Sequence, residues 1–270
     1  MPAAHRPINN LERLQTQRAL HPVRPTYLSQ QPICTGLPAL DCALGGGLTR
    51  GQIYEVFGPE SSGKTTLGLY LAGCIQAQGG MCAWIDADHS LDIAYATLCS
   101  VHQDSFLVSE TQNLEQGFYI LERLASSGAV DWLVLDSLTA LPLEAELAGD
   151  FREDYLHQRD DFLRQALHNL VQTLQSSQAT VLFISQTRHR TGHIYQSDQA
   201  STASLALKLR SGARFELVCT EVISDPGRIV GQAMQIRIVK HLYAQIFPTI
   251  NVDIMYNRGT NKNSKFRVAG

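Results

Sequence analysis

The segment Gly58-Pro59-Glu60-Ser61-Ser62-Gly63-Lys64-Thr65 constrains the fold of this chain more than any other. It fits the pattern G-x-x-x-x-G-K-[ST], in which glycines let backbone N–H groups turn inward around phosphate groups. The apolar run Ile53–Phe57 precedes it and a helical pattern follows, so the segment joins a strand to a helix. Lys64 would supply a positive charge to the β- and γ-phosphates, and the Thr65 hydroxyl would face Mg²⁺. We therefore expect a site for a nucleoside triphosphate with Mg²⁺.

Short apolar runs recur along the chain, at Ile53–Phe57, Met81–Ile85, Phe106–Val108, Trp132–Leu135 and Thr180–Ile184. Each is too short for a helix and apolar on both faces, which is typical of a strand buried in a parallel sheet. Helical patterns lie between them, roughly over 64–78, 92–100, 113–126 and 160–176. After residue 213 the period becomes two, which favours antiparallel strands at one edge. The sequence thus predicts an α/β fold with a mostly parallel twisted sheet flanked by helices.

Polar side chains stand at the ends of three of these runs. Asp136 ends an apolar strand at the carboxyl edge, where ligands bind in open α/β sheets, and would hold the hydration shell of Mg²⁺. The segment Ile85-Asp86-Ala87-Asp88, at the end of another strand, offers an acid that could polarise the attacking water. Gln186 follows a third and could sense the γ-phosphate. Together with Lys64 and Thr65, these residues predict a site for nucleotide hydrolysis.

Composition excludes several classes of protein. The 270 residues carry a formal charge of −3, which argues against attraction of the whole molecule to nucleic acid but leaves local patches open. No apolar run approaches the roughly 18 residues of a membrane span, and the N-terminus lacks the apolar core of a secretory signal. The six cysteines form no Cys-x-x-Cys pair, so we expect buried free thiols in a reducing compartment. These features favour a cytoplasmic protein without membrane contact.

Several segments, in this order, resemble the bacterial RecA family. They are 35–41, the glycines at 45–47, 58–66, 84–92 with the following Tyr95 and Ala96, 127–131, 134–137 and 184–188. The resemblance runs from about Thr35 to about Tyr256. It implies a RecA-like phosphate-loop ATPase core that polymerises on single-stranded DNA, pairs it with homologous duplex DNA, and serves recombination, repair and the SOS response.

The resemblance also implies roles for individual residues. ATP binding extends along the loop to Thr66, Tyr95 stacks on the adenine, and Asp92 lies beside it. Gln186 couples the γ-phosphate to the DNA-binding loop that follows. Lys240 reaches across to the ATP of a neighbouring subunit in a filament or ring.

DNA binding is expected in the connection from Thr187 to about Leu209, which is long and polar. Between Arg188 and Arg214 there are five Lys and Arg residues against one acid. Basic side chains with an aromatic platform are the ingredients of single-strand binding. The resemblance adds Gly192 in the connection and two residues on the polar face of the preceding helix. The candidate DNA-binding residues are Arg164, His168, Arg188, Arg190, Gly192, Tyr195 and Lys208.

Some positions depart from the family pattern. Asp88 stands where the family has a catalytic glutamate, so we expect slow hydrolysis because a carboxylate displaced by about 1 Å can cost about 10²-fold in rate. Leu242 stands where a second lysine would reach the neighbour's phosphate. Residues 144–161 hold seven acids and two arginines. Such a segment repels a phosphate backbone, and either a solvated loop or a regulatory surface is consistent with it.

We expect three regions: an N-terminal appendage over 1–33 with a short helix near 10–20, the ATPase core over 34–256, and a flexible basic tail over 257–270 in place of the family's further C-terminal domain. Three functions fit this organisation. The first is a DNA-dependent ATPase of homologous recombination and repair. The second is a non-catalytic, ATP-switched relative that regulates another recombinase or a repair polymerase. The third, a small-molecule kinase, leaves the long basic loop unexplained.

Overall fold

The computed structural model describes residues 32–149, 155–187, 205–226, 228–242, 249–255 and 266–268. The candidate helix near 10–20 and part of the basic loop, with Arg188, Arg190, Gly192 and Tyr195, lie outside the described residues. Within those residues, no helix is long and apolar enough to cross a membrane.

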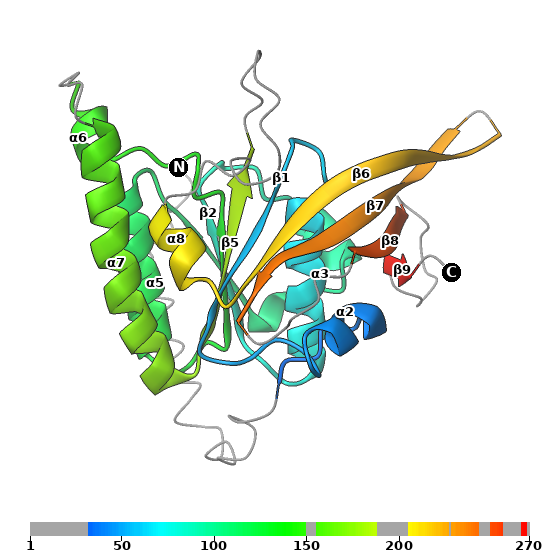
Figure 1. The fold of residues 1–270 in the computed structure, drawn as a ribbon, viewed down its shortest axis with the longest axis horizontal. Helices are drawn as coiled ribbons and strands as arrows, with labels where there is room; N and C mark the ends of the chain where they lie inside the picture. The colour runs from blue at the N-terminus through cyan, green and yellow to red at the C-terminus, as the bar shows by residue number, and fades with distance from the viewer. Residues whose placement is uncertain are drawn as a thin grey trace, which may run out of the picture.

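The described strands form one nine-stranded sheet in the order β3-β2-β4-β5-β1-β6-β7-β8-β9 (Figure 1). From β3 to β6 each pair of neighbours is parallel, and from β6 to β9 each pair is antiparallel. The predicted mostly parallel sheet with antiparallel strands at one edge is therefore confirmed. The strands are β1 (Ile53–Gly58), β2 (Cys82–Asp86), β3 (Phe106–Glu110), β4 (Trp132–Asp136), β5 (Thr180–Gln186), β6 (Ala213–Asp225), β7 (Arg228–His241), β8 (Thr249–Met255) and β9 (Phe266–Val268).

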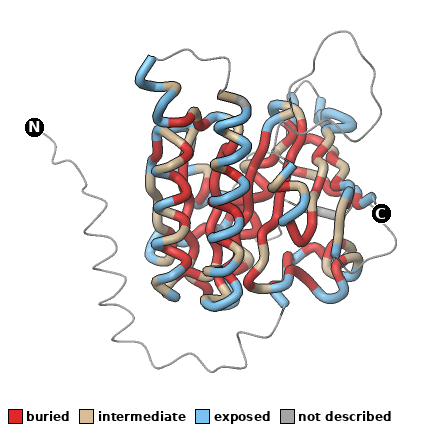
Figure 2. Tube along the Cα trace, turned by 60° about the vertical axis from the view of Figure 1, so that its left-hand side comes forward, coloured by how far each residue is buried: buried red, intermediate tan, exposed pale blue. Residues whose placement is uncertain are grey.

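Helices cover both faces of the sheet. One core contains side chains of α2 (Pro38–Ala43), α3 (Lys64–Ala77) and α4 (Ile93–Leu98), and the other contains side chains of α5 (Leu114–Ser126), α7 (Tyr155–Ser177) and α8 (Leu205–Arg210). In β4, Trp132 and Val134 belong to the first core, while Leu133 and Leu135 belong to the second. Because successive side chains of a strand point to opposite faces, a strand buried on both sides is apolar throughout. Figure 2 shows these buried strands behind helices that are exposed on their outer faces.

The remaining described helices are short: α6 (Glu144–Leu147) and the 3₁₀ turn η2 (Gln103–Ser105). Within the acidic segment, α6 and the first two turns of α7 are helical, so α7 begins at Tyr155 rather than near 160. The half-buried guanidinium of Arg159 donates hydrogen bonds to the carbonyls of Leu141 at 2.5 Å and Leu138 at 2.9 Å. Part of the acidic segment is thus anchored to the core.

Three other expectations need correction. The basic connection does not run as a loop to Leu209, because residues 205–210 form α8, which buries Leu207 in the second core. The tail contributes β9 at the sheet edge, where we expected a flexible arm, because its backbone pairs with β8. Of the six free cysteines, only Cys82 and Cys99 are buried and Cys74 is half-buried, while the other three are exposed.

The hairpin of β6 and β7 positions one wall of the site. Strand β6 pairs with β1 only from Ala213 to Glu216 and then continues beyond the carboxyl end of β1 (Figure 1). Strand β7 returns beside it and pairs with β8. The two strands thereby extend past the point where the phosphate loop begins.

Candidate nucleotide site

The phosphate loop joins β1 to the start of α3 and depends on its glycines. Gly63 has φ +80°, and a Cβ there would lie 2.8 Å from Met234 Sδ and from Ile254 Cδ1. A Cβ on Gly58 would lie 2.2 Å from the carbonyl oxygen of Leu217. The hydroxyl of Ser62 is buried and has no hydrogen-bond partner among the described residues. A buried unpaired donor beside a helix N-terminus fits a site for an anionic ligand.

Lys64 is buried at the first position of α3. Its ammonium donates a hydrogen bond to the Pro59 carbonyl at 2.5 Å, so the side chain folds back over the loop. Burial lowers the pKa of Lys64, while the charges of Asp136 and Glu60 act in the opposite direction. A phosphate group in the loop would give this ammonium an anionic partner in place of a carbonyl.

Thr65 and Asp136 meet at the carboxyl edge of the sheet. The Thr65 hydroxyl donates to Asp136 Oδ2 at 2.6 Å. Burial raises the pKa of Asp136 to about 6, the charges of Asp88 and Asp86 add to the rise, and the bond from Thr65 opposes it. A hydroxyl and a carboxylate are oxygen ligands of the kind Mg²⁺ takes together with water and substrate phosphates. Among the described residues, no group of three His, Cys, Asp or Glu side chains could hold a metal ion.

Asp88 and Gln186 lie at the same cavity, from different strands. The cavity has a volume of about 340 Å³, and its lining includes Lys64, Thr65, Asp88, Asp136 and Gln186. Burial raises the pKa of Asp88, and the hydrogen bond from the Ser137 hydroxyl, 3.1 Å from Oδ2, lowers it. The backbone N–H of Gln186 donates to Thr139 Oγ1 at 3.1 Å. The loop that follows β4 therefore contacts both residues.

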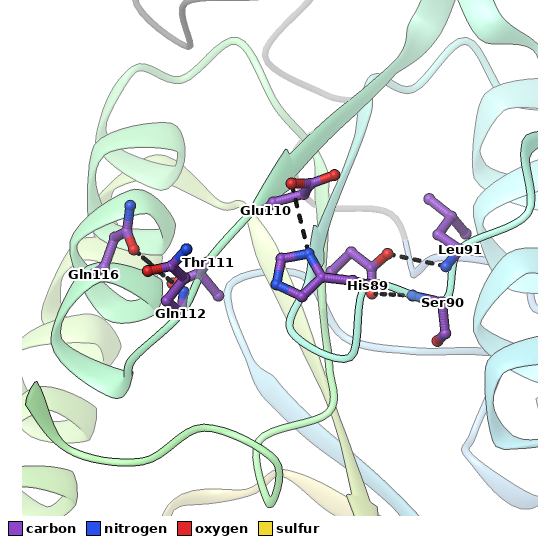
Figure 3. A network of polar contacts seen from close by, with 8 residues as sticks. His89, Ser90, Leu91, Glu110, Thr111, Gln112 and Gln116 are labelled. Atoms are coloured by element: carbon purple, nitrogen blue, oxygen red, sulfur yellow. Dashed lines mark hydrogen bonds and ion pairs between the residues drawn. The ribbon is translucent and has the colours of Figure 1, made fainter. Parts of the chain in front are cut away.

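Asp86, two residues before Asp88, has a different environment. Its carboxylate accepts hydrogen bonds from the backbone N–H groups of Ser90 at 3.3 Å and Leu91 at 2.9 Å, which fixes the turn after β2. His89 adopts φ 52° within this turn, and its Nδ1 lies 3.5 Å from Glu110 Oε2 (Figure 3). In the same view, the Gln116 side chain accepts from the backbone of Gln112 at 3.2 Å. These contacts fix the turn after β2 and join it to the end of β3.

The two residues predicted at the adenine lie at the start of α4. Asp92 caps this helix by accepting from the N–H groups of Ala94 at 2.8 Å and Tyr95 at 3.2 Å. The Tyr95 hydroxyl is 2.9 Å from Thr66 Oγ1. Tyr95 therefore lies beside the phosphate loop, and the cap on α4 fixes its backbone.

Three predicted DNA-binding residues are described, and they lie on two packed helices. On α7, exposed Arg164 pairs with Asp161 at 2.7 Å, and His168 Nδ1 is 3.1 Å from Nη2 of Arg210 on α8. Lys208 also lies on α8, so this part of the predicted surface is a helix rather than a loop. The structure thus brings His168 of α7 close to the basic end of α8.

Lys240 contacts that same helix. Its ammonium donates to the carbonyls of Lys208 at 2.7 Å and Leu209 at 2.8 Å, at the C-terminus of α8. Burial lowers the pKa of Lys240, and Arg214 on the neighbouring strand adds to the effect. The guanidinium of Arg214 is paired with fully buried Glu55 and lies over the Phe57 ring. To contact the ATP of a neighbouring subunit, Lys240 would have to leave α8.

Sequence reasoning missed four polar residues of this region: Ser90, Ser137, Thr139 and Gln232. The serines and Thr139 follow predicted strand ends, so their proximity to the edge was a usable signal. Gln232 carried no such signal, because it reaches the cavity from β7 of the antiparallel hairpin.

Comparisons with known proteins show the family to which the chain belongs. The family described as RecA N-terminal domain matches residues 7–261. The chain is 40% identical over 234 residues to Protein RecA of Desulforapulum autotrophicum, covering 86% of this chain and 67% of that protein. It is 40% identical over 231 residues to Protein RecA of Ehrlichia canis, covering 85% and 65%, and 39% identical to that of Cutibacterium acnes, covering 85% and 66%. The chain thus spans about two thirds of the length of these relatives, and it belongs to the RecA family.

Proposed function

We propose that this chain is an ATP-dependent recombinase of homologous recombination and DNA repair, with DNA-stimulated ATP hydrolysis. The observation that carries the proposal is the single cavity joining Lys64, Thr65, Asp88, Asp136 and Gln186. These residues come from the phosphate loop and from three strand ends. Together they supply a phosphate-binding loop, two side chains for one metal ion, a general base and a side chain that could contact the γ-phosphate.

Each residue has a distinct part in hydrolysis. Lys64 turns from the Pro59 carbonyl to the phosphates, where its charge offsets the charge that develops in the transition state. Thr65 and ionised Asp136 would hold Mg²⁺, and a bound Mg²⁺ would supply positive charge that offsets the charge of the phosphates. Asp88 accepts hydrogen bonds from the attacking water and orients it, with Ser137 holding the carboxylate.

Gln186 would link hydrolysis to DNA. It ends β5 and lines the cavity, and the basic connection begins directly after it. A side chain that contacts the γ-phosphate would therefore change the position of that connection when phosphate is released. The proposal also includes DNA contacts by two groups of residues. The connection would contribute Arg188, Arg190, Gly192 and Tyr195, and the two described helices would contribute Arg164, His168 and Lys208.

The enzyme is favoured over the ATP-switched regulator because the hydrolysis site is complete in its parts. The substitution of Asp88 for the family glutamate bears on rate, and we propose slow turnover rather than none. We also propose that subunits self-associate, with Lys240 contacting the ATP of a neighbouring subunit. Leu242 stands where a second lysine would reach that phosphate, so this contact has only one positive charge.

The proposal is tested by the binding of a labelled single-stranded oligonucleotide, followed by fluorescence anisotropy with and without ATP and Mg²⁺. We expect tight binding only with nucleotide and a strong decrease in affinity with added salt. Thr65→Val removes the hydroxyl that faces the metal and should remove the nucleotide dependence. Thr97→Val, at an exposed position of α4, is the matched control. Binding by the native protein that is equal with and without ATP would contradict the proposal.

A further inference from the structure

Two thiols that hydrolysis does not use lie near the C-terminal end of α3. Cys74 is half-buried in the last turns of that helix, and Cys34 is exposed in the segment that precedes α2. Both are free cysteines in this structure. Forty residues of sequence separate them, so their approach depends on the tertiary fold.

One side-chain amide joins the backbones of the two cysteines. Gln78 Nε2 donates to the Cys74 carbonyl at 2.9 Å and to the Cys34 carbonyl at 3.1 Å, so only one nitrogen atom lies between the two oxygens. Asp41 holds the residue after Cys34, because its carboxylate accepts from the backbone N–H of Thr35 at 2.8 Å and from the Thr35 hydroxyl at 2.7 Å. The backbone of Cys34 is thus fixed beside the end of α3.

The side chain of Cys74 points at the segment that carries Cys34. A Cβ on Gly36, two residues after Cys34, would lie 2.9 Å from Cys74 Sγ, so the absence of a side chain there leaves room for this sulfur. The Tyr70 hydroxyl donates to the Gly36 carbonyl at 3.2 Å and holds the same segment on α3. Burial raises the pKa of Cys74, the hydrogen bond with Tyr70 lowers it, and the charge of Cys34 raises it. The two thiols are therefore near enough to act on each other electrostatically.

Cys34 is the thiol that a dissolved reagent reaches first. Its Sγ donates to Asp41 Oδ2 at 3.0 Å, and this hydrogen bond raises the pKa of Cys34. A higher pKa lowers the fraction of thiolate but makes each thiolate a stronger nucleophile. Cys74 is less exposed, so it is placed to react with Cys34 rather than with a molecule from solution.

We propose that Cys34 and Cys74 are a reversible oxidation site, at which a low-molecular-weight disulfide such as oxidised glutathione converts the two thiols to a disulfide bond. The Cys34 thiolate attacks one sulfur of the reagent and forms a mixed disulfide, while the other half leaves as a thiolate. The Cys74 thiolate then attacks Cys34 Sγ and displaces the second half. The protons of the two cysteine thiols pass to the two glutathione thiolates. Two cysteines are oxidised and one disulfide molecule is reduced, and the step does not depend on ATP binding.

Non-reducing peptide mapping of the full chain after incubation with oxidised glutathione tests the proposal. We expect a peptide pair joined through Cys34 and Cys74, without glutathione on either residue, and its loss with dithiothreitol. The bond would close a long loop between the segment before α2 and the helix that begins at Lys64. The melting midpoint should therefore rise by at least about 4 °C on oxidation.

Serine variants separate the two steps. Cys74→Ser should retain glutathione on Cys34, because no second thiol displaces it. Cys34→Ser should acquire glutathione at Cys74 at least about 10-fold more slowly than Cys74→Ser acquires it at Cys34, because Cys74 is half-buried. Cys42→Ser, at an exposed position of α2, is the matched control and should form the bond as the native protein does.

Three outcomes with the native protein would overturn the proposal, and none needs a variant to fold. The first is glutathione that stays on Cys34, because Cys74 would then be unable to reach it. The second is a disulfide that joins Cys34 to Cys42 instead. The third is a bond between Cys34 and Cys74 that fails to raise the melting midpoint, because the sulfurs would then meet only in a distorted fold.

Discussion

Lengthening the carboxylate at position 88 should accelerate ATP hydrolysis. Asp88 lines the cavity, and its Oδ2 is held 3.1 Å from the Ser137 hydroxyl. Asp88→Glu adds one methylene group and moves the carboxylate about 1 Å further toward the phosphates. A displacement of that order changes rates by about 10²-fold, so we expect turnover to rise by about 10- to 100-fold with saturating DNA.

The assay is steady-state phosphate release at saturating ATP, with and without single-stranded DNA. Asp88→Asn removes the basic oxygen and should lower turnover by at least about 10²-fold. Asp104→Glu makes the same chemical change at an exposed position of η2, outside the cavity lining, and should leave turnover unchanged. Equal turnover by native protein and Asp88→Glu would refute the reasoning, because the shorter side chain would then already reach the attacking water.

Three further predictions follow from the site. Asp136 has a pKa raised to about 6, above the value of about 3.9 in an unfolded chain, so its contribution to stability is full below about pH 4 and is lost as the pH rises through about 6. The melting midpoint of nucleotide-free protein in EDTA should therefore include a decrease between about pH 4 and pH 6 that comes from Asp136. Asp136→Asn should remove this decrease, and a variant with the same pH profile as the native protein would refute the raised pKa of Asp136. Lys240→Met removes two hydrogen bonds from the end of α8 and should lower the melting midpoint by about 2–4 °C. Arg237 is an exposed residue of the same strand and lies 3.6 Å from half-buried Glu216 of β6, and Arg237→Met should leave the midpoint unchanged. Gly63→Ala forces a Cβ against Met234 and Ile254 at positive φ and should weaken ATP binding more than 10-fold by titration; native affinity would show that the loop tolerates the side chain.

The parallel half of the fold could be predicted because burial on both faces leaves a simple pattern. Runs such as Trp132–Leu135 must be apolar at every position, and the structure places them as expected in β4 and its neighbours. The amphipathic stripe of the 160–176 helix is also confirmed, with Leu163, Leu167 and Leu170 in the second core. The candidate site residues Asp136, Asp88 and Gln186 follow these strands, so their place at one edge of the sheet could be predicted.

The antiparallel half could be predicted only in outline. Alternation indicated strands near Phe215 and Ile236, but not how far the hairpin extends beyond β1 or what it contacts. The approach of Met234 to Gly63 depends on register across three strands, which no local pattern encodes. Lys240 likewise contacts α8 through tertiary packing, and α8 lies at the end of the long polar connection that was expected to run as one loop.

The measurement that tests the central claim most directly is ATP turnover with and without single-stranded DNA, comparing native protein with Lys64→Ala. Removing the ammonium leaves the charge that develops on the phosphates without its closest cationic side chain, and one such group is commonly worth about 10²- to 10³-fold. We predict slow native turnover that DNA stimulates and that Lys64→Ala reduces to background. Native turnover that DNA does not change, or that Lys64→Ala retains, would contradict the account.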